Sequence, residues 1–394
     1  MTIVVTGGGS GGHITPILAV ANELKQLQPD CTIVYIGQRG DMLGDVPAQD
    51  KNIDAAYTIW AGKLRRYHGE GLRQLLDIKT VALNVRDVFR TLRGMWQVYW
   101  LLRRIKPDMI FIKGGFVGVP VGLMGALRHI PYVTHDSDAL PGLANRIVAR
   151  WATVHAVALP KEVYQYPPDK TMTVGVPISS DFQPVTASGK VRYRQELGLE
   201  QYEQIILMTG GGNGALRLNQ ALETCAPDLL EQYPNLAIVH IAGRGHEDDI
   251  AAAYDAHVQS KDRGRVIVKG FVHDMYRYSG AADIVITRAG ATTLAEFAAQ
   301  EKACIMVPNP ILTGGHQLKN AQVLADREAV IIVRENDLVS DGLALLPPLV
   351  ELLDHPEKRG RLSERLATLA RLDSAHQLAM VLLDTVAASQ KTNQ

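Results

Sequence analysis

The stretch VVTGGGSGGHITP at residues 4–16 joins a short apolar run to a helix-like segment through five glycines and one serine. The β-branched residues before it predict a strand over 2–6, and the apolar spacing after it predicts a helix over 16–28. Glycine is needed where the backbone takes a positive φ or passes close to a ligand. A strand, a glycine turn and a helix in this order predict the start of a parallel α/β sheet.

The same scheme repeats along the chain. A second glycine turn, LMTGGGNGALRLN at 207–219, opens a second series of alternating strands and helices. Proline-rich residues separate the two series, so we predict a domain over 1–165, a linker over 166–184 and a domain over 185–370, followed by a helical tail at about 371–394. Strands are predicted over 2–6, 32–36, 109–112, 131–134 and 154–158, then over 204–209, 236–241, 265–268, 283–287 and 303–307. Helices are predicted over 16–28, 71–91, 95–105, 119–128 and 141–151, then near 215–230, 247–259, 273–280, 292–300 and 316–326.

Composition narrows the class of protein. In 394 residues no apolar run approaches the roughly 18 residues that span a bilayer, and the glycines at 7–12 interrupt any secretory signal. Cys31, Cys225 and Cys304 occur singly, without metal-ligand spacing, which predicts reduced cysteines in a cytoplasmic protein and no metal site. The formal net charge is zero and no reading motif is present, so nucleic acid is not an expected partner.

The glycine turns allow two interpretations. They can simply make tight turns, or they can present the free N–H groups of a helix N-terminus to an anion. Neither turn ends in GK[ST], which disfavours a P-loop ATPase, and no ribose carboxylate follows the first turn at the spacing of a dinucleotide site. Glu296, in the helix after TRAG at 287–290, can accept two hydrogen bonds from a ribose diol. A glutamate early in a helix is also favourable without a ligand.

Together, these motifs resemble the MurG family of N-acetylglucosaminyltransferases. They are GGGSGGH at 7–13, KGGFVGVP at 113–120, HDSDALPGLANR at 135–146, GGGNGALRLN at 210–219 and the block from TRAGATTLAEF to GGHQLKNA at 287–321. The resemblance implies a GT-B fold, in which two Rossmann-like parallel-sheet domains face each other across a cleft and the final helix packs back on the first domain. It implies inverting transfer of GlcNAc from UDP-GlcNAc to the C4 hydroxyl of MurNAc in lipid I, giving lipid II for peptidoglycan, without a cofactor.

The resemblance also assigns residues to the site. His13 and Asp136 are the two candidates for the general base, and His13 can alternatively cap its helix or bind acceptor phosphate. Uracil is expected near Phe271 and Val272, the ribose on Glu296, and the GlcNAc hydroxyls near Gln317 and Asn320. The diphosphate is expected near Gly211, Gly212, Asn213, Gly290, Ala291, Thr292 and Thr293. The acceptor is expected near Gly9, Ser10, Gly11, Gly12, His13, Gly114, Gly115, His135 and Asn145.

Four sites in the sequence depart from the family pattern. The usual His-Glu-x-Asn is His135-Asp136-Ser137-Asp138 here, and Gly212 stands where a serine is usual. Within the linker, Ser179 follows Val176-Pro177-Ile178 where the family usually has an arginine after Asn-Pro-Val, so we expect Arg288 to supply that contact. Position 316 is histidine where the family tends to have glutamine.

Residues 61–106 carry eleven lysines and arginines against three acidic residues, interleaved with leucine, valine, phenylalanine, tryptophan and tyrosine. At helical spacing this pattern separates an apolar from a basic face, which is typical of a helix lying on an anionic membrane surface. We therefore expect a peripheral protein on the cytoplasmic face of the membrane. An ordinary surface helix with a core-facing stripe is the alternative.

Two other functions stay open at this stage. The first is a different enzyme on the same scaffold, such as a UDP-GlcNAc 2-epimerase or a transferase to another lipid acceptor. The second is a non-catalytic subunit that binds a nucleotide sugar. The departures at 136–138 leave room for the first, and the presence of both His13 and Asp136 argues against the second.

Overall fold

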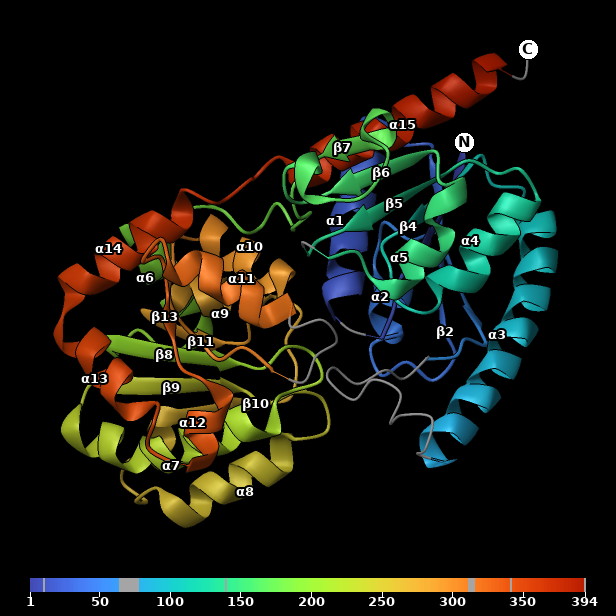
Figure 1. Cartoon of the computed structure of the whole chain (residues 1–394). Coiled ribbons are helices and arrows are strands. Elements are labelled where there is room, and N and C mark those ends of the chain that lie inside the picture. Colours follow the sequence, from blue (N-terminus) through green and yellow to red (C-terminus); the bar gives the residue numbers. More distant parts are fainter. Residues whose placement is uncertain (10, 64–77, 139, 311–315, 341, 393–394) are drawn as a thin grey trace. The chain divides into compact units, whose positions relative to one another are not determined.

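A computed structural model describes residues 1–9, 11–63, 78–138, 140–310, 316–340 and 342–392 of the chain. The chain folds into two compact units (Figure 1). The first comprises Met1–Ser179 and Arg371–Gln394, and the second comprises Ser180–Pro310 and Gln317–Ala370. The linker predicted over 166–184 contains a strand, Thr171–Thr173, that belongs to the sheet of the first unit.

The first unit is built on a seven-stranded parallel sheet in the order β3-β2-β1-β4-β5-β6-β7. The chain therefore runs outward from β1 to β3, crosses back to β4 and continues to the other edge. The strands are β1 (Thr2–Thr6), β2 (Thr32–Gln38), β3 (Ala55–Ile59), β4 (Met109–Ile112), β5 (Tyr132–Asp136), β6 (Val154–Val157) and β7 (Thr171–Thr173). The central strands β4 and β5 are buried along their whole length, as parallel strands between helices are, and β4 is apolar throughout.

Two layers of helices cover this sheet. Ile3 and Val5 of β1 pack with α1 and α15 on one face, whereas Val4 packs with α3, α4 and α5 on the other. The predicted tail helix is α15, and it contacts α1 of the first unit. The helices are α1 (Gly11–Leu27), α2 (Asp45–Gln49), α3 (Ile78–Ile105), α4 (Gly118–Leu127), α5 (Leu143–Val148) and α15 (Ser374–Thr392), with short 3₁₀ turns at Ala149–Trp151, Lys161–Val163 and Pro168–Lys170.

Helix α3 differs from the prediction of two helices with a break at 92–94. It runs through Gly94 without interruption. A Cβ at Gly94 would lie 1.9 Å from the carbonyl oxygen of Trp60, so glycine is present because the helix backbone packs directly on the segment after β3. The part of the predicted basic segment at 64–77 lies outside the described residues. In the described part of the chain, no helix combines the length and apolarity needed to cross a bilayer.

The second unit repeats the architecture with six parallel strands in the order β10-β9-β8-β11-β12-β13. Helices α7, α8, α12 and α13 pack on one face, and α6, α9, α10 and α11 on the other. The strands are β8 (Gln204–Thr209), β9 (Leu236–Ile241), β10 (Val266–Lys269), β11 (Ile284–Thr287), β12 (Ala303–Met306) and β13 (Ile331–Ile332). The helices are α6 (Ala187–Leu197), α7 (Leu216–Gln232), α8 (Glu247–His257), α9 (Met275–Ala281), α10 (Ala291–Ala299), α11 (His316–Ala325), α12 (Glu335–Ser340), α13 (Leu346–Asp354) and α14 (Pro356–Ala367), with a 3₁₀ turn at Arg263–Arg265.

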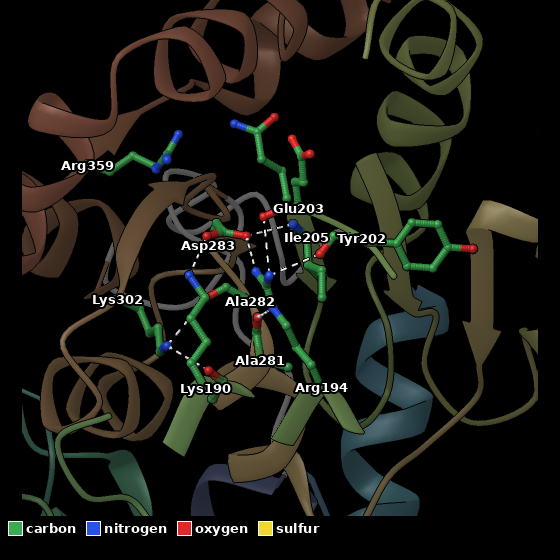
Figure 2. A network of polar contacts seen from close by, with 12 residues as sticks. Lys190, Arg194, Tyr202, Glu203, Ile205, Ala281, Ala282, Asp283, Lys302 and Arg359 are labelled. Atoms are coloured by element: carbon green, nitrogen blue, oxygen red, sulfur yellow. Dashed lines mark hydrogen bonds and ion pairs between the residues drawn. The ribbon is translucent and has the colours of Figure 1, made fainter. Parts of the chain in front are cut away.

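A charged network fixes α6 to the amino-terminal ends of β8 and β11 (Figure 2). The Asp283 carboxylate accepts hydrogen bonds from Arg194 Nη2 and from the Ile205 amide, both at 2.7 Å, and it pairs with Lys190. Nearby, the buried Lys302 ammonium donates to the carbonyl oxygens of Gly280 and Ala282 at 3.2 and 3.3 Å. These groups join α6, β8 and β11 at the edge opposite the carboxyl ends of the strands, so we assign them a structural role.

The predicted α/β class and both parallel sheets are confirmed. β3, β7 and β13 were not predicted. Each lies at or near a sheet edge and is short or only half-apolar, so its sequence lacks the continuous apolar run of a central strand.

Candidate functional site

Each sheet reverses its strand order once, between β1 and β4 in the first unit and between β8 and β11 in the second. Loops leaving the carboxyl ends of strands on either side of such a reversal diverge and leave a crevice, where ligands bind in open α/β sheets. The glycine turn at 7–13 follows β1 and the one at 210–214 follows β8. Topology alone therefore places both sequence motifs at ligand-binding edges.

In the first unit the turns after β1 and β4 touch. Gly9 has φ +83°, and Gly114 and Gly115 have φ +119° and +77°. A Cβ at Gly115 would lie 2.6 Å from the Gly8 carbonyl oxygen, so the contact itself excludes a side chain there. The Gly9 amide donates to Asp41 Oδ2 at 2.7 Å, so this N–H, expected to meet the acceptor, serves the turn. The glycines therefore provide close packing as well as an open edge at Gly11, where a Cβ would meet no atom within 4 Å.

His13 lies in the first turn of α1, against Gly114 and Gly115 of the β4 turn. Its Nδ1 is 2.9 Å from the Gly8 carbonyl oxygen. Because that oxygen can only accept, Nδ1 carries the hydrogen and the neutral ring has its lone pair on Nε2. Burial, with Lys113 nearby, lowers the pKa of His13 to about 4, so the ring is uncharged at neutral pH. An uncharged imidazole with a defined Nε2 lone pair can accept a proton.

Asp136, the last residue of β5, is almost fully buried. Its Oδ1 accepts from Asn145 Nδ2 at 3.0 Å and from the Gly142 amide at 3.1 Å, and its Oδ2 accepts from the Tyr166 hydroxyl at 2.9 Å. Burial raises its pKa, although these three donors and Lys113 oppose the rise. Both oxygens are occupied, so Asp136 holds the start of α5 and the segment of Tyr166 in place.

His135 has a structural contact. Its side chain is fully buried and Nε2 donates to the Gly175 carbonyl oxygen at 2.8 Å. His135 therefore tethers the segment after β7, and its contact with the acceptor stays a prediction. Asn145 is also buried, and its amide nitrogen donates to the His135 carbonyl oxygen at 2.9 Å as well as to Asp136. We therefore expect Asn145 to act on the acceptor only through Asp136 and the loop after β5.

In the second unit three loops meet at the carboxyl edge. Gly243 after β9 lies so close to Gly214 after β8 that a Cβ on Gly243 would be 2.3 Å from the Gly214 Cα. The Arg244 amide donates to the Gly212 carbonyl oxygen at 3.2 Å, and its guanidinium carbon lies 4.3 Å from the centre of the Phe271 ring. Sequence reasoning missed Arg244, although a glycine-flanked arginine directly after a strand is a usable signal. Gly211, with φ +86° and no atom within 4 Å of a Cβ, is the open part of this edge.

Glu296 lies in the second turn of α10, on the helix that follows β11. It is half-buried, and its carboxylate makes no hydrogen bond or ion pair with any residue that the structure describes. Burial raises the pKa of Glu296 to about 8. A half-buried carboxyl group without protein donors suits a ligand that brings its own, as a ribose diol does.

The other expected donor residues lie in the loop before α9, at the start of α10 and in α11. Phe271 and Val272 are half-exposed in the loop before α9, and Gly290, Ala291, Thr292 and Thr293 form the start of α10. Gln317 Oε1 accepts from the Asn309 amide at 2.9 Å, and Asn320 Nδ2 donates to the Ala289 carbonyl oxygen at 3.3 Å. Both amides thus order the loops beside α10.

Arg288 is placed differently from the expectation. Its guanidinium is buried, and Nη1 donates to Glu335 Oε2 at 2.8 Å and to the Val307 carbonyl oxygen at 3.0 Å. A diphosphate contact would have to compete with this buried ion pair, which is costly to open. Arg244 is therefore the better-placed arginine at this edge.

The remaining expectations concern Ser10, His316 and the absence of a metal site. Ser10 lies outside the described residues, as does the side chain of His316. Within the described ranges, no three histidine, cysteine, aspartate or glutamate side chains are grouped as metal ligands.

Comparison with known proteins gives the family of both halves. The model described as "Glycosyltransferase family 28 N-terminal domain" matches residues 3–157, and "Glycosyltransferase family 28 C-terminal domain" matches residues 205–378. A relative from Natranaerobius thermophilus is 32% identical over 86% of this chain and 88% of its own length. It is named UDP-N-acetylglucosamine--N-acetylmuramyl-(pentapeptide) pyrophosphoryl-undecaprenol N-acetylglucosamine transferase.

Solved structures confirm the GT-B fold class. The crystal structure of Acinetobacter baumannii MurG aligns over 97% of this chain and 99% of its own, with a TM-score of 0.65 at 24% identity. A UDP-GlcNAc 2-epimerase from Neisseria meningitidis, bound to UDP-GlcNAc, aligns over 98% of this chain and 100% of its own, with a TM-score of 0.63 at 13% identity. Likeness of fold thus extends to both kinds of enzyme, whereas the sequence relationship at 32% is with the transferase.

Proposed function

The chain belongs to glycosyltransferase family 28, and we propose that it transfers GlcNAc from UDP-GlcNAc to the C4 hydroxyl of MurNAc in undecaprenyl-diphosphate-linked lipid I. The product is lipid II, the precursor of peptidoglycan. The observation that carries this proposal is the 32% identity to a transferase of that name over 88% of its length. The sheet topology and the residues at both carboxyl edges agree with it.

On the acceptor side, we assign proton transfer to His13. Nε2 takes the proton of the C4 hydroxyl while the oxygen forms its bond to the anomeric carbon of GlcNAc and the bond from that carbon to UDP breaks. Gly8 supports this role because its carbonyl oxygen fixes the tautomer. Asp136 is the less suitable base, because both of its carboxylate oxygens accept structural hydrogen bonds from Gly142, Asn145 and Tyr166. We infer that Asp136 positions the loop beside His13.

On the donor side, we assign the ribose diol to Glu296 and the leaving diphosphate to the start of α10 and the turn at Gly211–Gly212. The first N–H groups of α10 have no partners within their own helix, and their dipole favours the negative charge that develops on UDP. Arg244, between Gly212 and the Phe271 ring, adds a cation at this edge. No metal ion is needed in this scheme to neutralise the leaving group.

We also propose that α3 contacts an anionic membrane surface, where a lipid-linked acceptor resides. Seven exposed apolar side chains share one face of α3, since they recur every three or four residues. This α3 stripe consists of Val81, Val85, Val88, Phe89, Leu92, Trp96 and Trp100. The opposite face is the buried one, at Val98 and Leu102, so core packing does not explain the stripe.

Basic residues border the α3 stripe along one side. Arg86, Arg90, Arg93 and Arg104 lie about 80° to 140° around the helix from its centre, given 3.6 residues per turn. Each such residue adds about 1 kcal/mol of attraction to an anionic leaflet. Apolar side chains of this size, bordered by arginine, match a helix that lies flat in the interface.

The experiment that tests the function measures UDP release from UDP-GlcNAc with and without a lipid I analogue. Release that requires the acceptor, together with a disaccharide product, supports the transferase. An epimerase would convert UDP-GlcNAc into its C2 epimer without any acceptor, and a binding subunit would retain UDP-GlcNAc without turnover. Either result contradicts the proposal.

A further inference from the structure

Lys113, the residue after β4, is a buried cation beside the candidate acceptor site. Only 3% of its surface is exposed. Its Nζ donates to Ser137 Oγ at 2.9 Å, which ties the β4 turn to the loop after β5. The next two residues, Gly114 and Gly115, lie against the His13 ring. Lys113 thus stands between the proposed base and the loop that Asp136 holds.

A buried ammonium is costly unless opposite charges accompany it. Burial lowers the pKa of Lys113 to about 8, while Asp136 and Asp138 act in the opposite direction. The lysine therefore keeps most of its charge at neutral pH. Structural packing alone does not require a cation here, because an apolar side chain of the same length would fill the space without the desolvation cost.

The charge of Lys113 acts on His13. The charged groups that face the His13 ring come from three elements: Lys113 after β4, Asp138 after β5 and Asp41 after β2. Lys113 disfavours the imidazolium, whereas the two carboxylates favour it. Burial and Lys113 outweigh them, and the pKa of His13 falls to about 4.

We propose that Lys113 is a positioning residue of the acceptor site, which anchors the loop of Asp136 through Ser137 and keeps the His13 imidazole uncharged in the resting enzyme. The proposal rests on the function proposed above. It also gives a role to Ser137, whose hydroxyl is the group that receives the Lys113 hydrogen bond.

The test compares Lys113→Met with the wild-type enzyme in two measurements. In the pH profile of kcat, the loss of activity toward low pH should begin at a higher pH in the variant than in the wild type. The reason is that His13 protonates more readily without the neighbouring cation. The shift should be about one pH unit, the lower end for a nearby charge. NMR titration of His13, assigned with His13→Asn, should move upward by the same amount and needs no turnover.

Three further variants separate charge from structure. Ser137→Ala keeps the cation and removes the anchor, so turnover should fall several-fold while the His13 titration stays near that of the wild type. Lys302→Met removes an equally buried lysine from the second unit and should change neither readout. If Lys113→Met does not fold, Lys113→Gln, which retains a donor for Ser137, replaces it.

A folded Lys113 variant whose His13 titration and acid limb both equal those of the wild type overturns the proposal. An equal shift in Ser137→Ala also overturns it, because the effect would then come from loop geometry. The proposed function fails in a different way: wild-type enzyme would release no UDP with acceptor, although the NMR titrations would still report on Lys113 and His13.

Discussion

The affinity for UDP-GlcNAc should depend on pH through Glu296. Its pKa of about 8 means that only about one-tenth of the carboxyl groups are ionised at pH 7. A ribose diol donates two hydrogen bonds, and only the ionised carboxylate offers both oxygens as acceptors without a competing O–H, so we expect binding to expel the proton. Each pH unit below the pKa costs about 1.4 kcal/mol, so affinity should rise about tenfold between pH 7 and pH 9. The diphosphate of UDP-GlcNAc is esterified at both ends and does not titrate in this range.

Calorimetry in buffers of different ionisation enthalpy measures the protons released. The wild-type protein should release about 0.9 proton per UDP-GlcNAc at pH 7, which is the protonated fraction expected for a pKa of about 8. Glu296→Gln should release none and bind with an affinity that does not vary with pH. At pH 9 it should bind about 10- to 100-fold more weakly than the wild type, since a hydrogen bond to a charged group contributes about 1.5 to 3 kcal/mol. At pH 7 the difference should be about tenfold smaller.

The reasoning is refuted if the folded wild-type protein binds UDP-GlcNAc without proton release and with the same affinity at pH 7 and pH 9. Unchanged affinity in Glu296→Gln at pH 9 would remove Glu296 from the ribose site altogether. Thermal melts of both proteins provide the control that the fold is intact.

Three other changes test separate parts of the account. His13→Asn should lower kcat by about 10² to 10⁴ without changing the melting temperature or the affinity for UDP. Asp136→Asn should lower both kcat and the melting temperature, because it disturbs three hydrogen bonds. Near-normal turnover in His13→Asn would mean that another group is the base. The double variant Phe89→Ser, Trp96→Ser should bind anionic vesicles more weakly and transfer GlcNAc to long-chain lipid I more slowly, but it should keep its activity on a short-chain analogue. Leu127 is similarly exposed but lies outside the α3 stripe, so Leu127→Ser should change neither vesicle binding nor transfer to long-chain lipid I. Gly94→Ala should destabilise the fold by about 1 to 3 kcal/mol, because its Cβ would meet the backbone of Trp60. Gly360→Ala in α14 should stabilise the fold by up to about 1 kcal/mol, because a Cβ there meets nothing within 4 Å. Equal melting temperatures for the two alanine variants would contradict the packing assigned to Gly94.

The parts of the fold that sequence reasoning could reach are those with continuous apolar runs. β1, β4, β8 and β9 are buried along their length and were predicted within a residue or two. α3 was predicted as two helices because glycine usually weakens a helix. The reason for Gly94 is the Trp60 backbone, 34 residues earlier in the chain, and no local pattern contains that contact.

For the site residues, too, local sequence patterns could be read and contacts between distant residues could not. Glu296 and His13 could be proposed from the sequence because each lies near the start of a helix that follows a strand and a glycine-containing turn, which is a local pattern. The tethering role of His135 depends on Gly175, forty residues away, and the burial of Arg288 depends on Glu335. Lys113 and Arg244 were missed because their importance comes from neighbours on other strands, His13 and Ser137 for the first and Gly212 and Phe271 for the second.

The most direct test of the central claim follows one labelled sugar. Purified protein is incubated with UDP-GlcNAc carrying ¹³C at the anomeric carbon and with a short-chain lipid I analogue, and the product is examined by NMR. The account predicts that the label appears in the lipid product, β-linked to C4 of MurNAc, at a rate that His13→Asn reduces strongly. Label that stays on UDP, enters an α-linkage or appears in the C2 epimer of the donor would contradict it.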